Sequence, residues 1–223
     1  RVLSGYGQSG VTDHATGGAC IPEFLLQYEE SDWVFLRRLA SHFGTYLLAD
    51  ATDACGKVYF GVPEISYGTV LDRQGYTMEK DMLHYARVLE KEGVLSQEAS
   101  CWNVTVRFFL RMWETLTFNG IEAVVTAMRL HTEKGELVYS YVLARRAGIR
   151  REKEKNPGIF GMSIPATVME RSGNRIRVHF EIDPEYEASE KTKYFTYAIE
   201  SSSFYCMPEE GSQVHIYFPD HDE

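Results

Sequence analysis

The nearest approach to a catalytic motif lies at residues 161–165, Gly-Met-Ser-Ile-Pro. In serine hydrolases a Gly-x-Ser-x-Gly turn joins a strand to a helix and presents the serine hydroxyl to the substrate. Here Pro165 replaces the last glycine, and the residues that follow have the pattern of a strand. Ser163 is therefore not expected to be a nucleophile, and residues 7–10, Gly-Gln-Ser-Gly, fail in the same way.

Acidic residues and histidines provide weaker candidates. Glu209 and Glu210 could be the acid and base of a wall-degrading enzyme, but catalytic carboxylates normally project from different elements across a cleft, so a solvated turn is favoured. Residues 220–222, Asp-His-Asp, could touch a metal ion, yet one short run is weak evidence for a site. His42 lies near the end of a predicted helix, where a cation complements the helix dipole.

Two common ligand-binding motifs are also missing. Gly56-Lys57 lacks the upstream glycine and the following Ser or Thr of a phosphate-binding loop, and no His-Glu-x-x-His occurs among the seven histidines. The sequence therefore predicts no catalytic, cofactor-binding or metal-binding residues, and we expect the protein not to be an enzyme.

The composition favours a β-rich protein with a substantial core. Of the 223 residues 44% are hydrophobic, and 14 Tyr, 12 Phe and 3 Trp supply side chains that cover pleated faces well. The net charge of −9 argues against a nucleic-acid-binding surface, which needs clustered Lys and Arg. The densest basic run, residues 145–155, is broken by glutamates, and we interpret it as a solvated interdomain linker.

The cysteines indicate the state of the thiols, and the apolar segments bear on whether the chain spans a membrane. Cys20, Cys55, Cys101 and Cys206 are widely scattered and form no Cys-x-x-Cys pair, which indicates reduced, partly buried thiols. No apolar run approaches the roughly 18 residues that a transmembrane helix needs, so no membrane-spanning segment is predicted.

The clearest predicted helix begins after Ser31 and ends near Phe43. Ser31 can cap it, Leu39 belongs to its apolar stripe, and Gly44 supplies the left-handed stop. Arg38 is expected on the solvated side. Around this helix the sequence predicts a loop at residues 1–22, a strand at 24–28, and a hairpin of strands 45–50 and 57–62 with a turn at 53–56.

The middle of the chain changes from an ambiguous pattern to a β pattern. Residues 75–93 fit a helical face, with Met78 and Met82 on it. From Trp102 onward, alternation predicts a meander of about four strands, with tight turns at Asn119-Gly120 and at residues 133–135. Its apolar alternation covers residues 102–108, 116–118, 121–127 and 137–143.

The last third predicts a small barrel-like set of strands. Pro165, within a strand at residues 162–168, indicates a sheet edge or a bulge. Gly211 is expected to need a positive φ in the turn before the final strand, which alternates Val214, Ile216 and Phe218. The remaining predicted elements are a turn at 171–174, a strand at 176–182, a polar loop at 183–193 and a strand at 193–199.

Several segments carry a resemblance to a known family. Residues 207–219, Met-Pro-Glu-Glu-Gly-Ser-Gln-Val-His-Ile-Tyr-Phe-Pro, resemble the run that closes the OB β-barrel of contractile-injection spike proteins. Residues 27–44 resemble the Gln-Tyr-Arg-Glu-Thr-Asp helix region of a group of hub and spike proteins. This group contains phage baseplate hub proteins, the valine-glycine-repeat spikes of type VI secretion and the phage late control D-like proteins. Residues 59–64 resemble Gram-positive phage-like members, residues 111–143 resemble tail-tube-like strands, and residues 178–183 resemble an OB strand.

Two departures from the family pattern concern single segments. Position 29 is Glu where the family often has Arg, and residues 194–197, Tyr-Phe-Thr-Tyr, lack the proline of the corresponding OB strand.

The resemblance implies an α+β, mostly β fold in three parts. Residues 1–95 would form an α+β hub portion with a strand, a helix and a hairpin, incomplete at its N-terminus. Residues 96–156 would form a tube-like antiparallel β-barrel portion and the charged linker. Residues 157–223 would form a C-terminal OB-fold spike-base domain, which could be truncated.

The resemblance also implies a function in assembly. The protein would be a structural hub and spike component of a contractile phage tail or phage-tail-like injection device, a homotrimer that connects the tail tube to the spike. Its partners would be its own copies, tail tube and baseplate proteins, and a spike tip or effector, without sequence-specific contacts to nucleic acid. It would reside in a virion or a tail-like particle, encoded by a phage or a prophage and assembled in the bacterial cytoplasm. A tail-associated peptidoglycan hydrolase and a glycan-binding module are the alternatives.

Overall fold

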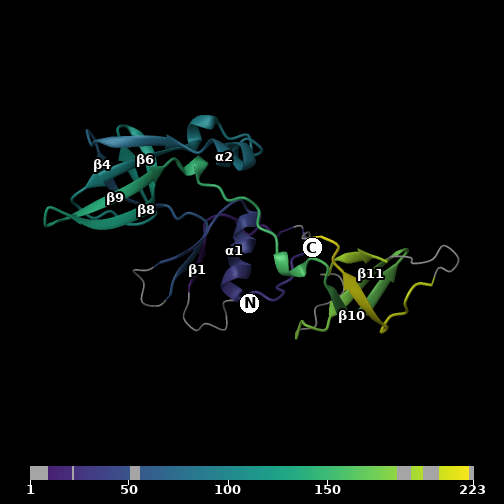
Figure 1. Cartoon of the computed structure of the whole chain (residues 1–223). Helices are drawn as coiled ribbons and strands as arrows, with labels where there is room; N and C mark the ends of the chain where they lie inside the picture. Colours follow the sequence, from purple (N-terminus) through teal and green to yellow (C-terminus); the bar gives the residue numbers. More distant parts are fainter. Residues whose placement is uncertain (1–9, 22, 51–55, 185–191, 198–205, 221–223) are drawn as a thin grey trace. The chain divides into compact units, whose positions relative to one another are not determined.

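A computed structural model describes residues 10–21, 23–50, 56–184, 192–197 and 206–220 (Figure 1). The chain forms two compact units, and each is built from two separate stretches. The first unit contains residues 1–20 and 31–154, and the second contains residues 21–30 and 155–223. None of the described helices is both long and apolar enough to cross a membrane.

The first unit begins with a small sheet beside the predicted helix. Helix α1 spans Asp32–His42, and the sheet has the order β1-β3-β2, with β1 at Val11–Asp13, β2 at Leu47–Ala49 and β3 at Val58–Phe60. β2 and β3 pair antiparallel, which confirms the hairpin strands, and β1 pairs parallel with β3. β1 lies where the sequence predicted only a loop, and residues 51–55 of the predicted turn lie outside the described residues.

Helix α1 begins and ends as the sequence predicted. The Ser31 side chain accepts a hydrogen bond from the Val34 amide at 3.4 Å. Gly44 has a φ of 62°, and its amide donates to the Ser41 carbonyl while the Thr45 amide donates to the Ala40 carbonyl. This pair of hydrogen bonds satisfies carbonyls that the helix end would otherwise leave without partners.

The burial along α1 corrects one prediction. Ala40 packs with Leu47 and Val58 in a small core, whereas Leu39 is only half-buried. Arg38, expected in solvent, is 2% exposed, and its guanidinium lies 5.4 Å from the centre of the Phe35 ring. The amphipathic stripe predicted the helix but not its buried cation, because tertiary packing and not helix periodicity buries this side chain.

A six-stranded sheet forms the rest of the first unit, in the order β4-β7-β8-β9-β6-β5. Alternating apolar residues of β6, β8 and β9 face one core, which includes Trp102, Phe118, Val125 and Tyr141. The alternation confirms the predicted strands, and β7, β8 and β9 form a meander. The predicted four-strand order is wrong, because β6 pairs with β9 and β5 and not with β7. The strands span Ile65–Leu71 (β4), Tyr76–Lys80 (β5), Ser100–Val106 (β6), Glu114–Phe118 (β7), Ile121–Glu133 (β8) and Glu136–Ala144 (β9).

Two parts of this sheet differ from the predictions. β4, which the sequence did not predict, runs parallel to β7, so the sheet is not purely antiparallel. Residues 75–93 are not one amphipathic helix: Met78 lies exposed in strand β5, and only short helical turns follow. These turns are α2 at Met82–His84, a wide π-helical turn η2 at Tyr85–Leu89, and a 3-10 turn η3 at Ser96–Ala99.

A bulge changes the phase of β8 in the middle of the strand. Val125 pairs with Leu143, but Ala127 pairs with Val142, so Thr126 is an extra residue. The Thr126 hydroxyl donates to the Val142 carbonyl at 3.1 Å. The predicted inward alternation therefore holds for Ala123 and Val125 and fails at Ala127, which is exposed.

The second unit is a four-stranded sheet with the order β12-β11-β10-β13. Its core includes Ile164, Val178, Ile216 and Phe218, as the predicted alternation requires. Gly211 has a φ of 85°, which confirms its predicted left-handed conformation. The strands are Ser163–Ser172 (β10), Arg175–Phe180 (β11), Tyr194–Thr196 (β12) and Gln213–Tyr217 (β13), preceded by the 3-10 turn η5 at Pro157–Ile159.

Two predictions about this unit are wrong. Residues 24–28 form no strand, and they instead pack Phe24, Leu26 and Tyr28 against the core of the sheet. Pro165 lies on an inner strand, not at an edge, and the register irregularity falls between Val168 and Glu170. The sheet tolerates the proline because the ladder between β10 and β11 begins only at Ala166.

The fold is therefore α+β and mostly β, as predicted. Within the described residues each large sheet is an open row of strands: β4 and β5 end the first, and β12 and β13 end the second.

Truncation of Arg38 tests the burial on α1. We expect Arg38→Ala to lower the free energy of unfolding by about 1–3 kcal/mol, because a fully packed side chain is lost. Arg87→Ala, at an exposed arginine of η2, should change it by less than about 0.5 kcal/mol. Urea denaturation followed by circular dichroism measures both, and equal small effects would contradict the assigned burial of Arg38.

Candidate assembly surface

The residues that the sequence analysis weighed for catalysis or metal binding at positions 163, 209–210 and 220–222 all lie in the second unit. Ser163 is exposed at the start of β10 and pairs with Tyr217, and Glu209 and Glu210 are exposed in the turn before β13. Asp220 is exposed, whereas residues 221 and 222 of the proposed metal run lie outside the described residues. Across residues 10–21, 23–50, 56–184, 192–197 and 206–220, no group of three His, Cys, Asp or Glu side chains could hold a metal ion.

The described thiols differ in exposure. Cys20 and Cys206 are exposed, which corrects the prediction of partly buried thiols for these two, and Cys55 lies outside the described residues. Cys101 is half-buried in β6, and burial, followed by the charges of Glu79 and Asp81, raises the pKa of its thiol. A raised pKa keeps the thiol protonated and unreactive.

The basic run is not the solvated linker that the sequence predicted. Arg146, in the 3-10 turn η4 (Arg146–Gly148), donates to the carbonyls of Val62 and Pro63 at 3.1 Å each and to the Thr115 hydroxyl at 2.7 Å. Ile149 is buried in the same segment. Residues 145–150 are thus a packed part of the first unit, and their arginines are donors to its backbone and side chains.

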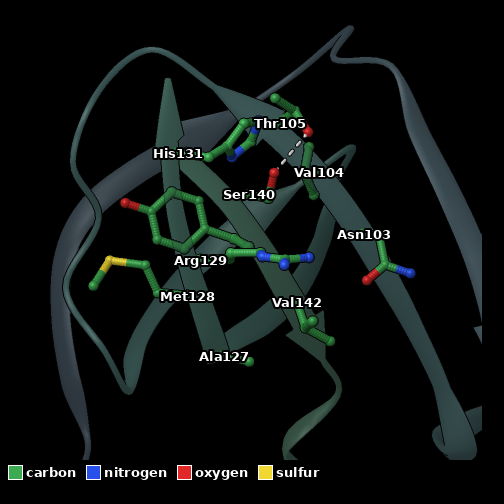
Figure 2. A pocket seen from close by; sticks show the side chains of 10 residues that line it. Asn103, Val104, Thr105, Ala127, Met128, Arg129, His131, Ser140 and Val142 are labelled. Atoms are coloured by element: carbon green, nitrogen blue, oxygen red, sulfur yellow. Dashed lines mark hydrogen bonds between the residues drawn. The ribbon is translucent and has the colours of Figure 1, made fainter. Parts of the chain in front are cut away.

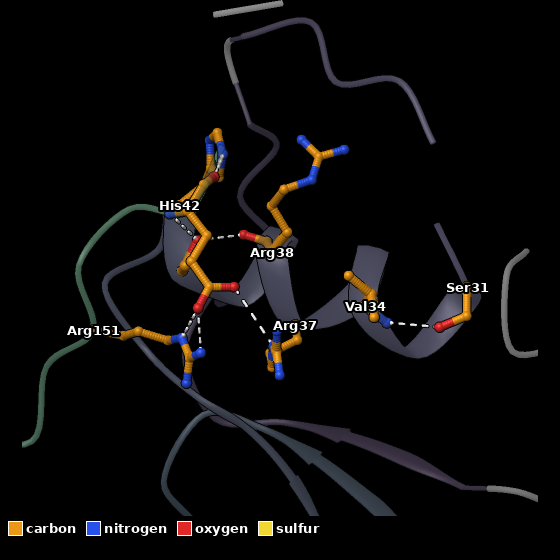
Figure 3. A network of polar contacts seen from close by, with 8 residues as sticks. Ser31, Val34, Arg37, Arg38, His42 and Arg151 are labelled. Atoms are coloured by element: carbon orange, nitrogen blue, oxygen red, sulfur yellow. Dashed lines mark hydrogen bonds and ion pairs between the residues drawn. The ribbon is translucent and has the colours of Figure 1, made fainter. Parts of the chain in front are cut away.

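A polar network attaches the end of this segment to α1 (Figure 3). The Glu154 amide donates to the Ser41 hydroxyl at 2.8 Å, and that hydroxyl donates to the Arg38 carbonyl at 2.6 Å. The Glu154 carboxylate accepts from Arg151 Nε at 3.0 Å. His42 Nε2 lies 3.2 Å from the Glu154 carbonyl oxygen, so this histidine positions backbone at the helix end.

The two end strands of the six-stranded sheet present apolar side chains to solvent. Tyr67 and Val70 of β4 are 56% and 58% exposed, and Tyr76 and Met78 of β5 are 51% and 61% exposed. An end strand also leaves one row of backbone N–H and C=O groups without a ladder partner. Open edges with large apolar residues are typical of surfaces that mate with another chain.

A buried carboxylate holds the β4 edge in place. Glu114, at the start of β7, is 3% exposed, and its two carboxylate oxygens accept hydrogen bonds from the Thr69 hydroxyl (2.5 Å) and the Arg111 amide (3.2 Å). Thr69 lies within the register irregularity between Ser66 and Val70. Glu114 therefore fixes the irregular part of the edge strand.

Arg111 supports the same edge from its side chain. Its Nη1 donates to the Tyr67 hydroxyl at 2.9 Å, and its guanidinium carbon lies 5.0 Å from the centre of the Tyr67 ring. Sequence reasoning missed both Glu114 and Arg111, because a charged residue in a predicted turn or strand start is normally assigned to the surface. The nearest sequence signal for this edge was the short alternation of Ile65, Tyr67 and Thr69, which is typical of a strand.

Comparison with solved structures identifies a shared fold. The chain is similar to the Escherichia coli c3393 protein, a component of the type VI secretion system that exhibits structural similarity to the T4 bacteriophage tail proteins gp27 and gp5. The TM-score is 0.55 at 15% identity, and the match covers 89% of this chain and 59% of that one. The chain is also similar to the 43 kDa tail protein of prophage MuSo2 from Shewanella oneidensis, with a TM-score of 0.47 at 10% identity, over 64% of this chain and 61% of that one.

Comparisons by sequence find no match, either among protein-family models or among curated proteins. By structure, the chain shares its fold with part of the type VI secretion component, and it spans about 59% of the length of that protein.

A glycine in η4 tests the packing of the basic run. A Cβ atom at Gly148 would lie 1.9 Å from the Glu98 carbonyl oxygen, so Gly148→Ala must displace backbone. We expect it to lower the free energy of unfolding by about 1–3 kcal/mol or more. Gly75→Ala, where no atom lies within 4 Å of the added carbon, is the matched control and should be close to neutral. A neutral Gly148→Ala in thermal denaturation would show that residues 145–150 are not packed against η3.

Substitution of Glu114 tests how the β4 edge is held. Glu114→Ala leaves the Thr69 hydroxyl and the Arg111 amide without their acceptor, and it should cost about 1–3 kcal/mol. Glu114→Gln can accept from the Arg111 amide and donate to the Thr69 hydroxyl, so it should retain most of the stability. Hydrogen exchange of the β4 amides gives a local readout, and the same exchange rates in Glu114→Ala as in the unchanged protein would refute the role of the carboxylate.

Proposed function

We propose that the chain is a structural hub and spike component of a contractile phage tail or a phage-tail-like injection device. The observation that carries the proposal is the shared fold with the type VI secretion component over 89% of this chain. The resemblance of residues 27–44 and 207–219 to hub and spike segments supports it independently, including the Gram-positive phage-like type for residues 59–64. The function is geometric and not catalytic.

In this proposal the three parts of the chain have separate tasks. Residues 1–95 form the hub portion and also supply the end strands β4 and β5 of the six-stranded sheet, residues 96–156 contribute the rest of that sheet to a tube-like barrel, and residues 157–223 form an OB-fold base for the spike. The four-stranded sheet β12-β11-β10-β13 supports the last assignment, because a Greek-key barrel of this type is built from a small, strongly bent antiparallel sheet.

The open sheet supports assembly of the chain with copies of itself. β4 and β5 are different strands at opposite ends of one sheet, so an edge of one copy can meet the other edge of the next. Contacts of this head-to-tail kind generate a closed ring when the rotation between copies closes. We propose a homotrimer that joins the tail tube to the spike, with tube, baseplate and spike-tip or effector proteins as further partners. Its location would be a virion or tail-like particle assembled in the bacterial cytoplasm.

Light scattering of the complete gene product tests the trimer. The expected mass is three times that of one chain, and a strictly monomeric species at tens of micromolar would contradict the proposal. A double variant, Val70→Lys with Met78→Lys, places charge on both edges and should reduce the mass to that of a monomer. Leu137→Lys, at another exposed apolar residue near the tip of the β8–β9 hairpin, should leave the trimer intact.

A peptidoglycan turbidity assay tests the non-catalytic part of the proposal. The purified protein should not clear the suspension. Sustained clearing that Glu209→Ala or Glu210→Ala abolishes would instead favour a tail-associated hydrolase.

A further inference from the structure

The face of the six-stranded sheet opposite its core contains a polar hollow (Figure 2). The hollow has a volume of about 550 Å³ and lies over β6, β8 and β9. Its side chains include two cationic or potentially cationic groups, Arg129 and His131, and three neutral polar groups, Asn103, Thr105 and Ser140. No carboxylate side chain lines it. None of these five residues has a part in the edge contacts described above.

The bulge at Thr126 is the reason that Arg129 and His131 lie on this face. Ahead of the bulge, Ala123 and Val125 point into the core, so uninterrupted alternation would also direct residues 127, 129 and 131 inward. The extra residue reverses the phase, and Arg129 then pairs with Ser140 and His131 with Val138. Bulges that re-aim side chains in this way are common beside functional sites.

The neutral groups of the hollow are partly occupied, whereas the side chains of Arg129 and His131 are available. Thr105 Oγ1 and Ser140 Oγ lie 3.3 Å apart, and Asn103 Nδ2 donates to Glu79 Oε1 at 3.0 Å. Arg129 and His131 are exposed, and neither side chain has a hydrogen bond or an ion pair with any residue that the structure describes. The hollow thus combines unpaired donors with hydroxyls that can donate or accept.

We propose that this hollow binds an extended acidic segment of a partner protein, with carboxylates two residues apart. Arg129 and His131 are themselves two residues apart on one strand, so their Cα atoms are separated by roughly 7 Å. An extended partner strand repeats its side chains at the same spacing. The planar Arg129 guanidinium suits a bidentate carboxylate, and His131 offers a ring N–H to the second one.

Charge complementarity favours a protein carboxylate over a nucleic-acid phosphate. The chain carries a net charge of −9, which repels a polyanion approaching the molecule as a whole. A short acidic segment presents only a few charges and can enter a locally positive hollow. Binding of this kind would hold whether or not the chain forms a trimer.

Nuclear magnetic resonance of the ¹⁵N-labelled chain provides the test. The probe is the peptide acetyl-Ser-Glu-Ser-Glu-Ser-amide, and its Gln-containing twin is the neutral control. We expect saturable shifts in the amide signals of Thr105, Arg129 and Ser140 with the acidic peptide only. Arg129→Gln should weaken binding by at least about threefold, a loss of the size expected for an exposed ion pair. Arg87→Gln removes the same charge at an exposed site outside the hollow and should leave the affinity unchanged.

Three results would overturn the proposal. The first is the absence of saturable shifts at millimolar peptide in a chain whose spectrum shows it to be folded. The second is an equal loss of affinity in Arg129→Gln and Arg87→Gln, since this would indicate general attraction between opposite charges. The third is saturation of the same signals by inorganic phosphate at concentrations where the acidic peptide does not bind, which would assign the hollow to a phosphate ligand.

Discussion

The first unit depends on one guanidinium. Arg146 donates to two consecutive carbonyls, at Val62 and Pro63, and to the Thr115 side chain, so it joins the segment after β3, the start of β7 and the end of β9. An arginine presents several N–H groups in a fixed plane, whereas a lysine would offer one point charge to acceptors that lie in different directions. The hydrogen bonds from the Arg146 guanidinium to these carbonyls are charge-assisted, and they make the junction specific.

From this junction residues 146–154 lead back to helix α1. Three contacts hold this segment: Gly148 lies against η3, Ile149 is buried, and Glu154 joins the polar network at α1. A segment that looked like a linker therefore closes the first unit by fastening its last strand to α1. None of these contacts involves the strands β4 and β5, which end the six-stranded sheet.

The sequence predicted what depends on local pattern. Alternation gave β6 and β11, Asn119-Gly120 gave a hairpin, and Ser31 with Gly44 gave both ends of α1. It missed what depends on distant partners. β4 is a strand because β7 lies beside it, Arg38 is buried by tertiary packing, and Arg146 and Arg150 find acceptors far away in the chain. The hollow could not be predicted, because one extra residue at Thr126 reverses every side chain that follows in β8.

The division of the second unit between residues 21–30 and 155–223 sets an order of events during synthesis. Phe24 packs within 5.6 Å of the Phe180 ring centre and 5.3 Å of the Phe195 ring centre, so its partners leave the ribosome long after it does. At the usual rate of translation the delay is about 10–30 s. Throughout that interval Phe24, Leu26 and Tyr28 are an apolar stretch of the growing chain without their core, to which a holding chaperone could bind.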